Sequence, residues 1–432
     1  MRSVMRTAVG AVLASGLTAG VLASGAAAGE RDGAPEDRAA KAAKGIERIS
    51  TAPDGKEGDG FSGRASLSAD GRYAAFTSRA SNLVPGDTNG VDDVFVRDLK
   101  TGKTQRVSLG AGGAQADAAS DDAAISADGR HVAFSSEAGN LDGDAKGSHV
   151  YVRDLKKGTT ERIKDDVGAP AFDRSGSPAL SADGRTVAFQ VWKSEVQPGG
   201  DDGRIYALDR DSGKLTRVSQ EPSGENDVHA GMRPSVSADG AKVGYQWAET
   251  QRTGRRDWSD LYVYDLRGGK RVQADVTQGG ATADAHAEGP RISADGRSLT
   301  YHSPATNIVP DDGNGTQNVF IRDLDKGTTK MISAENKDWA VYGASLSRDN
   351  GKLLFTAGAP GGGSESHAYL RDLRTGATTL VSAATDGKPT KYSATAGDID
   401  RTGKTVTFTS ASDDLVAGDS YDTTHVYARH AQ

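Results

Sequence analysis

The chain has 432 residues, with Lys and Arg totalling 52 against 59 Asp and Glu, and a formal net charge of -7. This mildly acidic balance argues against nucleic acid or an anionic membrane as a partner, because both favour basic surfaces. The chain has no cysteine, which excludes disulfides, thiolate metal sites and cysteine nucleophiles. The 55 glycines beside only 13 prolines are typical of a turn-rich folded protein rather than a disordered proline-rich chain.

The first 28 residues have the pattern of a secretory signal peptide. Two arginines precede an uncharged stretch over residues 7–23, and Ala26-Ala27-Ala28 offers a cleavage site of the A-x-A type. We therefore expect a secreted, extracellular protein that is cleaved near Ala28. Residues 29–45 are charged and alanine-rich, which predicts a flexible linker. No later stretch approaches the ~20 apolar residues that a membrane-spanning helix needs.

A four-residue segment, Ser-Ala-Asp-Gly, repeats through residues 46–432. Full copies begin at Ser68, Ser126, Ser181, Ser237 and Ser293, and degenerate copies surround Asp349 and Asp400. The interval between successive aspartates runs from 58 residues (Asp70 to Asp128) down to 51 (Asp349 to Asp400). Self-similarity at such a period indicates a repeat architecture.

Each repeat is predicted to form four short strands. In the first repeat, an alternating run ends before Asp70, and further runs cover residues 73–77, 94–96 and 105–108. Aspartate and glycine between the first two strands suit a tight hairpin, because Gly accepts positive φ and Asp bonds to its own backbone. An Asp-x-x-x-Gly turn follows the third strand in six repeats. Four-stranded units of this kind stack radially as the blades of a β-propeller.

The two ends of the chain predict how the ring closes. The seventh repeat has a second strand at 406–408 and a third at 425–427 but no fourth, and residues 47–50 match the fourth strand at 105–108. The sequence therefore predicts an all-β, seven-bladed β-propeller whose last blade is completed by an N-terminal strand. The structural alternative is an open solenoid, which would need distinct capping repeats.

Two longer motifs resemble those of a known family. The run Ser-Ala-Asp-Gly-Arg-x-x-Ala-Phe occurs at 68–76 and 181–189, and Val-x-Val-Arg-Asp-Leu occurs at 94–99 and 150–155. Together they resemble the TolB-type propellers with WD-like repeats, in their secreted bacterial branch. The resemblance covers residues 46–432 and implies the propeller fold; such propellers serve many roles, so it implies no single activity.

Two kinds of connection should emerge from opposite faces of the ring. The tight turns share one face, the turn face. The long connections, between second and third strands and between blades, share the other, the long-loop face, and long ordered loops often carry binding sites. All four tryptophans fall in these long connections, and the loop of the fourth repeat adds arginines. The ligand-binding candidates are therefore Trp192, Trp247, Arg255, Arg256, Trp258 and Trp339.

Aromatic rings beside arginine suit stacking on sugars or anchoring of a peptide. If these tryptophans bind a ligand, Trp247 and Trp258 should be exposed to solvent, on the same face as Trp192 and Trp339. The alternative is that the rings cover gaps between blades and have only a structural role.

No complete catalytic or metal-binding motif is present. The acidic loops, such as residues 87–93, resemble oxygen-ligand calcium loops but lack the EF-hand glutamate, so we interpret their acids as solvated turn residues. His229 and His286 occupy comparable loops and could face each other as metal ligands, although scattered histidines are more often merely polar. We therefore predict no catalytic residue, no metal and no cofactor.

The favoured function is a secreted binding or scaffold protein, a monomer that recognises an extracellular protein or glycan through its long-loop face. The alternative is a polysaccharide lyase or hydrolase with carboxylates and His229 or His286 in the central funnel. Several His, Asp or Glu side chains converging at the mouth of the channel would favour the enzyme. A mouth lined by Ser, Thr and Gly would favour binding.

Overall fold

A computed structural model describes residues 45–430, except for 144–146, 165–172, 194–202, 220–227, 251–257, 311, 314, 335–337, 360–365 and 421. The predicted signal peptide, and the predicted linker up to residue 44, lie outside the described residues. All described strands belong to one compact unit, Lys41–Gln432. Among the described residues, no helix is long and apolar enough to cross a membrane.

The described strands form seven antiparallel sheets of four strands each. The first three sheets contain β2 (Ser62–Leu67), β3 (Tyr73–Ser78), β4 (Asp93–Asp98) and β5 (Lys103–Arg106); β6 (Ser120–Ile125), β7 (His131–Ser136), β8 (His149–Asp154) and β9 (Thr159–Arg162); and β10 (Arg174–Leu180), β11 (Thr186–Trp192), β12 (Arg204–Asp209) and β13 (Lys214–Arg217). Two short 3-10 helices, η1 (Ala111–Gly113) and η2 (Gly139–Leu141), lie in connections of this part.

The other four sheets contain β14 (Val228–Val236), β15 (Lys242–Thr250), β16 (Trp258–Asp265) and β17 (Lys270–Gln273); β18 (Glu288–Ile292), β19 (Ser298–Ser303), β20 (Asn318–Asp323) and β21 (Thr328–Ile332); β22 (Ala340–Leu346), β23 (Lys352–Gly358), β24 (His367–Asp372) and β25 (Thr378–Leu380); and β26 (Ala394–Ile399), β27 (Thr405–Ser410), β28 (His425–His430) and β1 (Ile46–Arg48). The predicted seven-bladed propeller is therefore confirmed.

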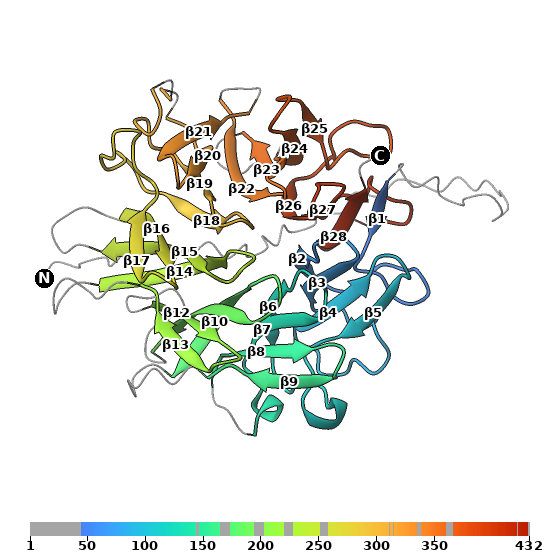
Figure 1. The fold of residues 1–432 in the computed structure, drawn as a ribbon. Helices are drawn as coiled ribbons and strands as arrows, with labels where there is room; N and C mark the ends of the chain where they lie inside the picture. The colour runs from blue at the N-terminus through green and yellow to red at the C-terminus, as the bar shows by residue number, and fades with distance from the viewer. Residues whose placement is uncertain are drawn as a thin grey trace, which may run out of the picture. The chain divides into compact units, whose positions relative to one another are not determined.

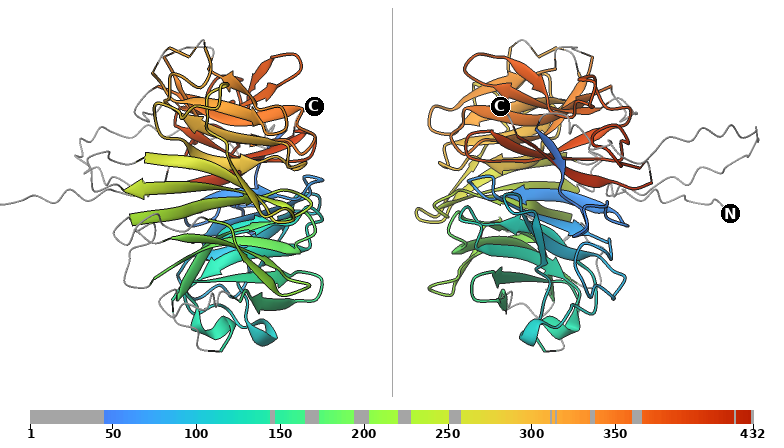
Figure 2. Two further views of the ribbon diagram at one scale, coloured as in Figure 1. Left: turned by 60° about the vertical axis from the view of Figure 1, so that its left-hand side comes forward. Right: turned by 90° about the vertical axis from the view of Figure 1, so that its right-hand side faces the viewer.

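The blades surround a common centre, with the first strand of each sheet innermost and the fourth at the rim (Figure 1). In the side views of Figure 2 the blades are seen edge-on, and the yellow-green sheet of blade 4 has the longest strands. The core lies between neighbouring sheets. It includes an aromatic pair from the second and third strands of six blades, such as Phe76 with Phe95 and Tyr301 with Phe320.

The ring closes as the sequence predicts. Strand β1 pairs antiparallel with β28, Glu47 facing Ala428, and so completes the seventh blade. Buried Arg48 of β1 forms ion pairs with Asp419 and Glu57. The imidazole of His430 lies 3.1 Å from the carboxylate of Glu47. The N-terminal strand is therefore held by side chains as well as by its ladder.

The Ser-Ala-Asp-Gly turns explain why the repeat recurs. In the first blade, the Ser68 hydroxyl donates to Asp70 at 2.6 Å, the Arg72 amide donates to the same carboxylate oxygen, and Gly71 has a φ of 68°. The turns also join the blades, because the amide of Ala69 donates to the carbonyl of Ala127, and the same bond links several later turns. The repeat is therefore a structural device at the turn face.

One prediction about these turns is wrong in detail. Asp400 does not occupy the aspartate position of the seventh turn; it occupies the serine position, with Thr402 at the aspartate position. The backbone bond from Asp400 to Thr405 matches that from Ser68 to Tyr73. The Asp400 carboxylate accepts from the amides of Thr402 and Thr405. One carboxylate thus replaces both the serine hydroxyl and the turn aspartate.

Candidate functional site

The first strand of every blade carries an irregularity in its register. In three consecutive blades, a non-glycine residue there adopts positive φ, namely Asp122 (55°), Ser177 (49°) and Arg233 (53°). All three stand four residues before the serine of the next turn. Such residues cost about 1–3 kcal/mol each and gather at functional sites. Ser177 and Arg233 also precede a proline, which further restricts their backbone.

Solvent reaches the centre of the ring. Arg64, Asp122 and Arg233 are exposed although they lie on innermost strands. We call the solvent-accessible space bordered by these first strands the central channel. Its long-loop end is marked by Phe61, which precedes β2, and its turn end by Ala69. At that turn end is a hollow of about 560 Å³ lined by turn residues, including Asp70 and Arg401. Because Asp70 is already bonded within its own turn, we place the site nearer the other end.

Three arginines converge in the channel from three blades. Arg64 of blade 1 is repelled by Arg291 and Arg233. Enclosure by protein is the main cause that lowers the pKa of Arg64 to about 10, and this repulsion is the second. The Arg64 Nη2 atom lies 3.3 Å from where a Cβ on Gly343 would stand, so this side chain extends to blade 6. Among the described residues, no carboxylate lies within ion-pair distance of Arg64 or Arg291. The channel therefore holds two guanidinium groups that have no ion-pair partner among the described residues, although the charge of Asp398 on β26 attracts Arg64 from a greater distance and partly opposes the fall in its pKa.

The third arginine, Arg233, also belongs to a polar cluster with a carboxylate and two histidines. Arg233 Nη1 lies 3.3 Å from Glu288 Oε2, and the Nε2 atoms of His286 and His302 each lie 3.8 Å from a Glu288 oxygen. A hydrogen bond with His302 is the main cause that lowers the pKa of Glu288 to about 2, and the charges of Arg233 and the two histidines contribute further. Glu288 therefore remains ionised and holds Arg233 in place.

Two adjacent carboxylates line another part of the channel wall. The Ser135 hydroxyl donates to Asp121 at 2.5 Å, and the Ser177 hydroxyl to Asp122 at 3.4 Å. Both aspartates are exposed, yet protein surrounds them. This enclosure raises the pKa of both, and with repulsion from Asp122 it brings that of Asp121 to about 6. The pair can hold a proton near neutral pH.

The structure contradicts the expectation for one residue of the predicted tryptophan site. Trp247 is not in a loop; it lies within β15 and is only 2% exposed, packed with Ile205 and Val218 between blades 3 and 4. The expectation that it is exposed is therefore wrong. The reason is that β15 is longer than predicted, and Val243, Tyr245 and Trp247 alternate on one buried face.

The other candidates have different environments. Trp192 ends β11 and is 7% exposed, with its ring against Gly176. Trp339 is partly buried against the core of blade 6. Trp258 begins β16, but its side chain lies outside the described residues, as do Arg255 and Arg256. Binding by these last three residues stays a prediction.

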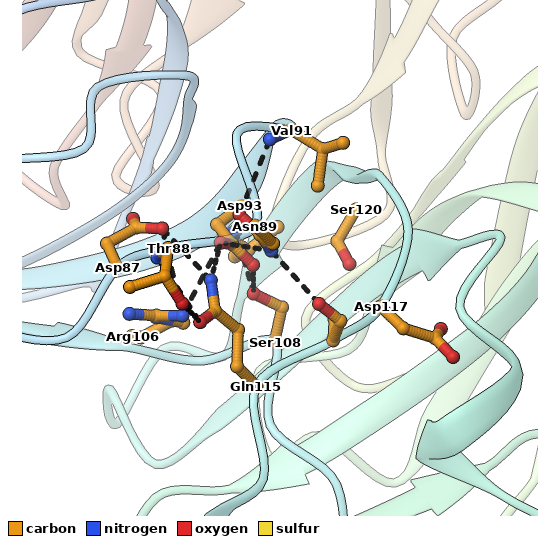
Figure 3. A network of polar contacts seen from close by, with 12 residues as sticks. Asp87, Thr88, Asn89, Val91, Asp93, Arg106, Ser108, Gln115, Asp117 and Ser120 are labelled. Carbon is orange, nitrogen blue, oxygen red and sulfur yellow. Dashed lines mark hydrogen bonds and ion pairs between the residues drawn. The ribbon is translucent and has the colours of Figure 1, made fainter.

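The acidic loop of blade 1 is not a set of solvated turn residues. The side chains of Asp87 and Asp93 are buried, 3.9 Å and 3.7 Å from Arg106 Nη1. Asn89 and Gln115 donate to these carboxylates as well (Figure 3). This network joins the loop to β4, β5 and the following connection. Its acids are neutralised from within the blade, so we interpret it as structural.

The histidine pair suggested by the sequence divides between two blades. His229 lies on β14 opposite Glu249, and His286 precedes β18, beside Glu288. The side chain of His229 lies outside the described residues, so a contact between the two histidines stays a prediction. Within the described ranges, no group of three His, Cys, Asp or Glu residues is arranged to hold a metal ion. Sequence reasoning missed Arg64 and Arg291, which each lie on the first strand of a blade. The sequence feature that could have revealed them is a charged residue within a short, mostly buried strand.

Comparison with known proteins shows a similarity of fold. No family model matches the chain, and no curated protein does. Solved structures that are similar include an oligogalacturonate lyase in complex with manganese (TM-score 0.59, 13% identity, 90% of this chain and 95% of that one). Another is an oligogalacturonate lyase from Vibrio parahaemolyticus (TM-score 0.55, 13% identity, 89% and 93%).

A third is the propeller domain of the Trilobed protease from Pyrococcus furiosus, which has an open velcro topology (TM-score 0.51, 14% identity, 81% and 89%). A putative TolB from Agrobacterium tumefaciens also matches (TM-score 0.43, 15% identity, 78% and 96%). At these identities the likeness is one of fold alone. The chain thus shares the β-propeller fold of the lyases and of the protease domain, closed here by β1.

Proposed function

We propose that this protein is a secreted β-propeller that binds an anionic extracellular ligand in its central channel, entered from the long-loop face. The observation that carries the proposal is the convergence of Arg64, Arg233 and Arg291, of which, among the described residues, only Arg233 forms an ion pair with a carboxylate. Like charges enclosed together are unfavourable without a counter-ion. Guanidinium groups bind carboxylates and other oxyanions through two parallel hydrogen bonds.

Secretion is supported by the signal-peptide pattern of residues 1–28 alone. The acidic net charge of the chain does not oppose the proposal, because an anion responds to the local field of a lined channel more than to the distant surface. The ligand therefore needs no basic protein surface outside the channel.

Titration calorimetry of the full secreted chain tests the proposal. The probes are oligogalacturonate and poly-L-glutamate, two anionic polymers of different backbone. Arg64→Gln and Arg291→Gln should each weaken binding of both about tenfold or more, the usual worth of a charged hydrogen bond. The matched control is Arg297→Gln, at a residue in the turn after β18 whose side chain is 71% exposed. Failure of both polymers to bind, or unchanged affinity of a bound polymer in Arg64→Gln, would overturn the proposal.

A second candidate function is cleavage of a bound polysaccharide. It is favoured by the His286, Glu288 and His302 cluster and by the Asp121 and Asp122 pair, since titratable groups with shifted pKa values often mark catalytic sites. Incubation with oligogalacturonate, followed by assays for new reducing ends and for unsaturated products, tests this function. Products that vanish in Glu288→Gln and Asp121→Asn would support an enzyme, and no products would leave binding alone.

A further inference from the structure

An exposed aromatic ring stands at the long-loop end of the channel. Phe61 is 50% exposed, and the other large apolar side chain exposed among the described residues is Val272. Val272 lies on β17, the outermost strand of blade 4. Among the described residues, Phe61 is therefore the only exposed large apolar side chain that stands beside an innermost strand. An exposed ring contributes little to stability, and a place next to a polar site suggests a ligand.

The backbone of Phe61 is fixed although its ring is exposed. Its carbonyl accepts a 2.8 Å bond from the amide of Arg79 and a 3.1 Å bond from the hydroxyl of Ser78, both at the end of β3. A Cβ on Gly63 would lie 3.6 Å from the ring, so the ring stands beside the first residues of β2. The ring is thus presented by an ordered part of the blade and not by a frayed loop.

The ring and the unpaired guanidinium group belong to the same stretch of chain. Arg64 follows Phe61 by three residues, a backbone separation of roughly 10 Å in an extended strand. That separation spans about two units of an oligosaccharide. The apolar face of a pyranose ring packs on an aromatic ring, and a charged substituent one or two units further along the sugar chain would then reach Arg64 and Arg291.

We infer that the ligand of the channel is an acidic sugar chain. One pyranose ring of this chain packs on Phe61, and a carboxylate or sulfate of the chain binds Arg64 and Arg291. This inference rests on the proposed function, because it takes the two arginines as the anion site. A purely acidic peptide such as poly-L-glutamate would satisfy the arginines equally well but has no apolar ring face to pack on Phe61. Phe61 is therefore the residue that separates the two ligand classes.

The test compares three probes on four proteins. Oligogalacturonate, dextran sulfate and poly-L-glutamate are titrated into the parent chain, Phe61→Ala, Phe61→Tyr and the control Val272→Ala. Phe61→Ala should weaken the acidic sugars about fivefold to tenfold and change poly-L-glutamate by about twofold or less. Phe61→Tyr should retain sugar binding, and Val272→Ala should change nothing. Because Phe61 and Val272 are exposed, unchanged thermal unfolding serves as the check that each variant folds.

The outcomes separate the inference from the proposed function. Binding of either sugar with the expected loss in Phe61→Ala supports the inference, and the better of the two sugars identifies carboxylate or sulfate as the acid. Equal weakening of poly-L-glutamate and the sugars in Phe61→Ala, or no weakening, overturns it. If poly-L-glutamate binds and neither sugar does, the inference fails while the proposed function stands. If no anion binds, the proposed function itself fails.

Discussion

Asp275 follows the outer strand of blade 4 at a position where other blades carry serine. In four blades that serine, for example Ser108 or Ser219, accepts a hydrogen bond from an amide of the third strand. Asp275 is fully buried, and neither of its carboxylate oxygens has a well-formed hydrogen bond among the described residues, although the Leu261 amide and the Gln273 side chain lie close enough to offset part of the effect of burial. Burial, followed by repulsion from Asp260, raises the pKa of Asp275 to about 7. Ionised Asp275 is therefore a source of instability within the blade.

The size of the effect follows from the difference between the two pKa values. In the unfolded chain the carboxyl group has a pKa of 3.8, against about 7 in the fold. The folded state therefore binds the proton more tightly, and the free energy of unfolding falls as the pH rises from about 4 to 7. At 1.36 kcal/mol per pKa unit, the cost above pH 7 is at most about 4 kcal/mol. Asp275→Ser should remove this cost and restore the bond to the third strand.

Urea unfolding at pH 4.5, 6 and 8, followed by tryptophan fluorescence, measures the prediction. Asp275→Ser should be clearly more stable than the parent chain at pH 8, and the advantage should shrink toward pH 4.5, where the carboxyl group is protonated in the folded state and most of the cost is gone. The control is Asp325→Ser, which makes the same charge change at a side chain that is 59% exposed. A variant that is less stable than the parent at pH 8, or an advantage that is independent of pH, would refute the reasoning.

Three further predictions concern the ring itself. Deletion of residues 46–50 should lower the thermal unfolding temperature by several degrees or more, because it removes the β1 ladder from β28; an unchanged temperature would contradict closure by this strand. Asp128→Ala should cost about 1 kcal/mol by urea unfolding, since it removes the bonds from Ser126 and Arg130, and should leave ligand binding intact; lost binding at unchanged stability would give this aspartate a functional role instead. The hydrogen bond to Glu47 raises the pKa of His430, so its contribution is fully present below the unfolded pKa and is lost as the pH rises through the folded pKa. His430→Gln should therefore lower the unfolding temperature at pH 5.5 and leave it unchanged at pH 8.5, and an equal loss at both values would exclude the ion pair as the cause.

Local sequence patterns were enough to predict the architecture of this protein. The repeating Asp-Gly hairpins and alternating runs predict four-stranded blades because each is a local signal, readable within about ten residues. Ring closure was also predictable, since the missing fourth strand of the last repeat matches residues 47–50 at the other end of the chain. The error at Asp400 arose where the motif degenerates, and only the backbone bond to Thr405 shows its true place.

The site depended on the tertiary structure. Trp247 looked like a loop residue because the sequence does not show that β15 continues to Thr250, and it is the packing between two sheets that buries the ring. Arg64 and Arg291 are 227 positions apart in the printed sequence, and nothing local to either predicts that they face the same space. They meet because the ring brings the first strands of all seven blades to one axis. A pattern within one repeat can predict a blade, whereas a site built from single residues of several blades exists only once the ring has closed.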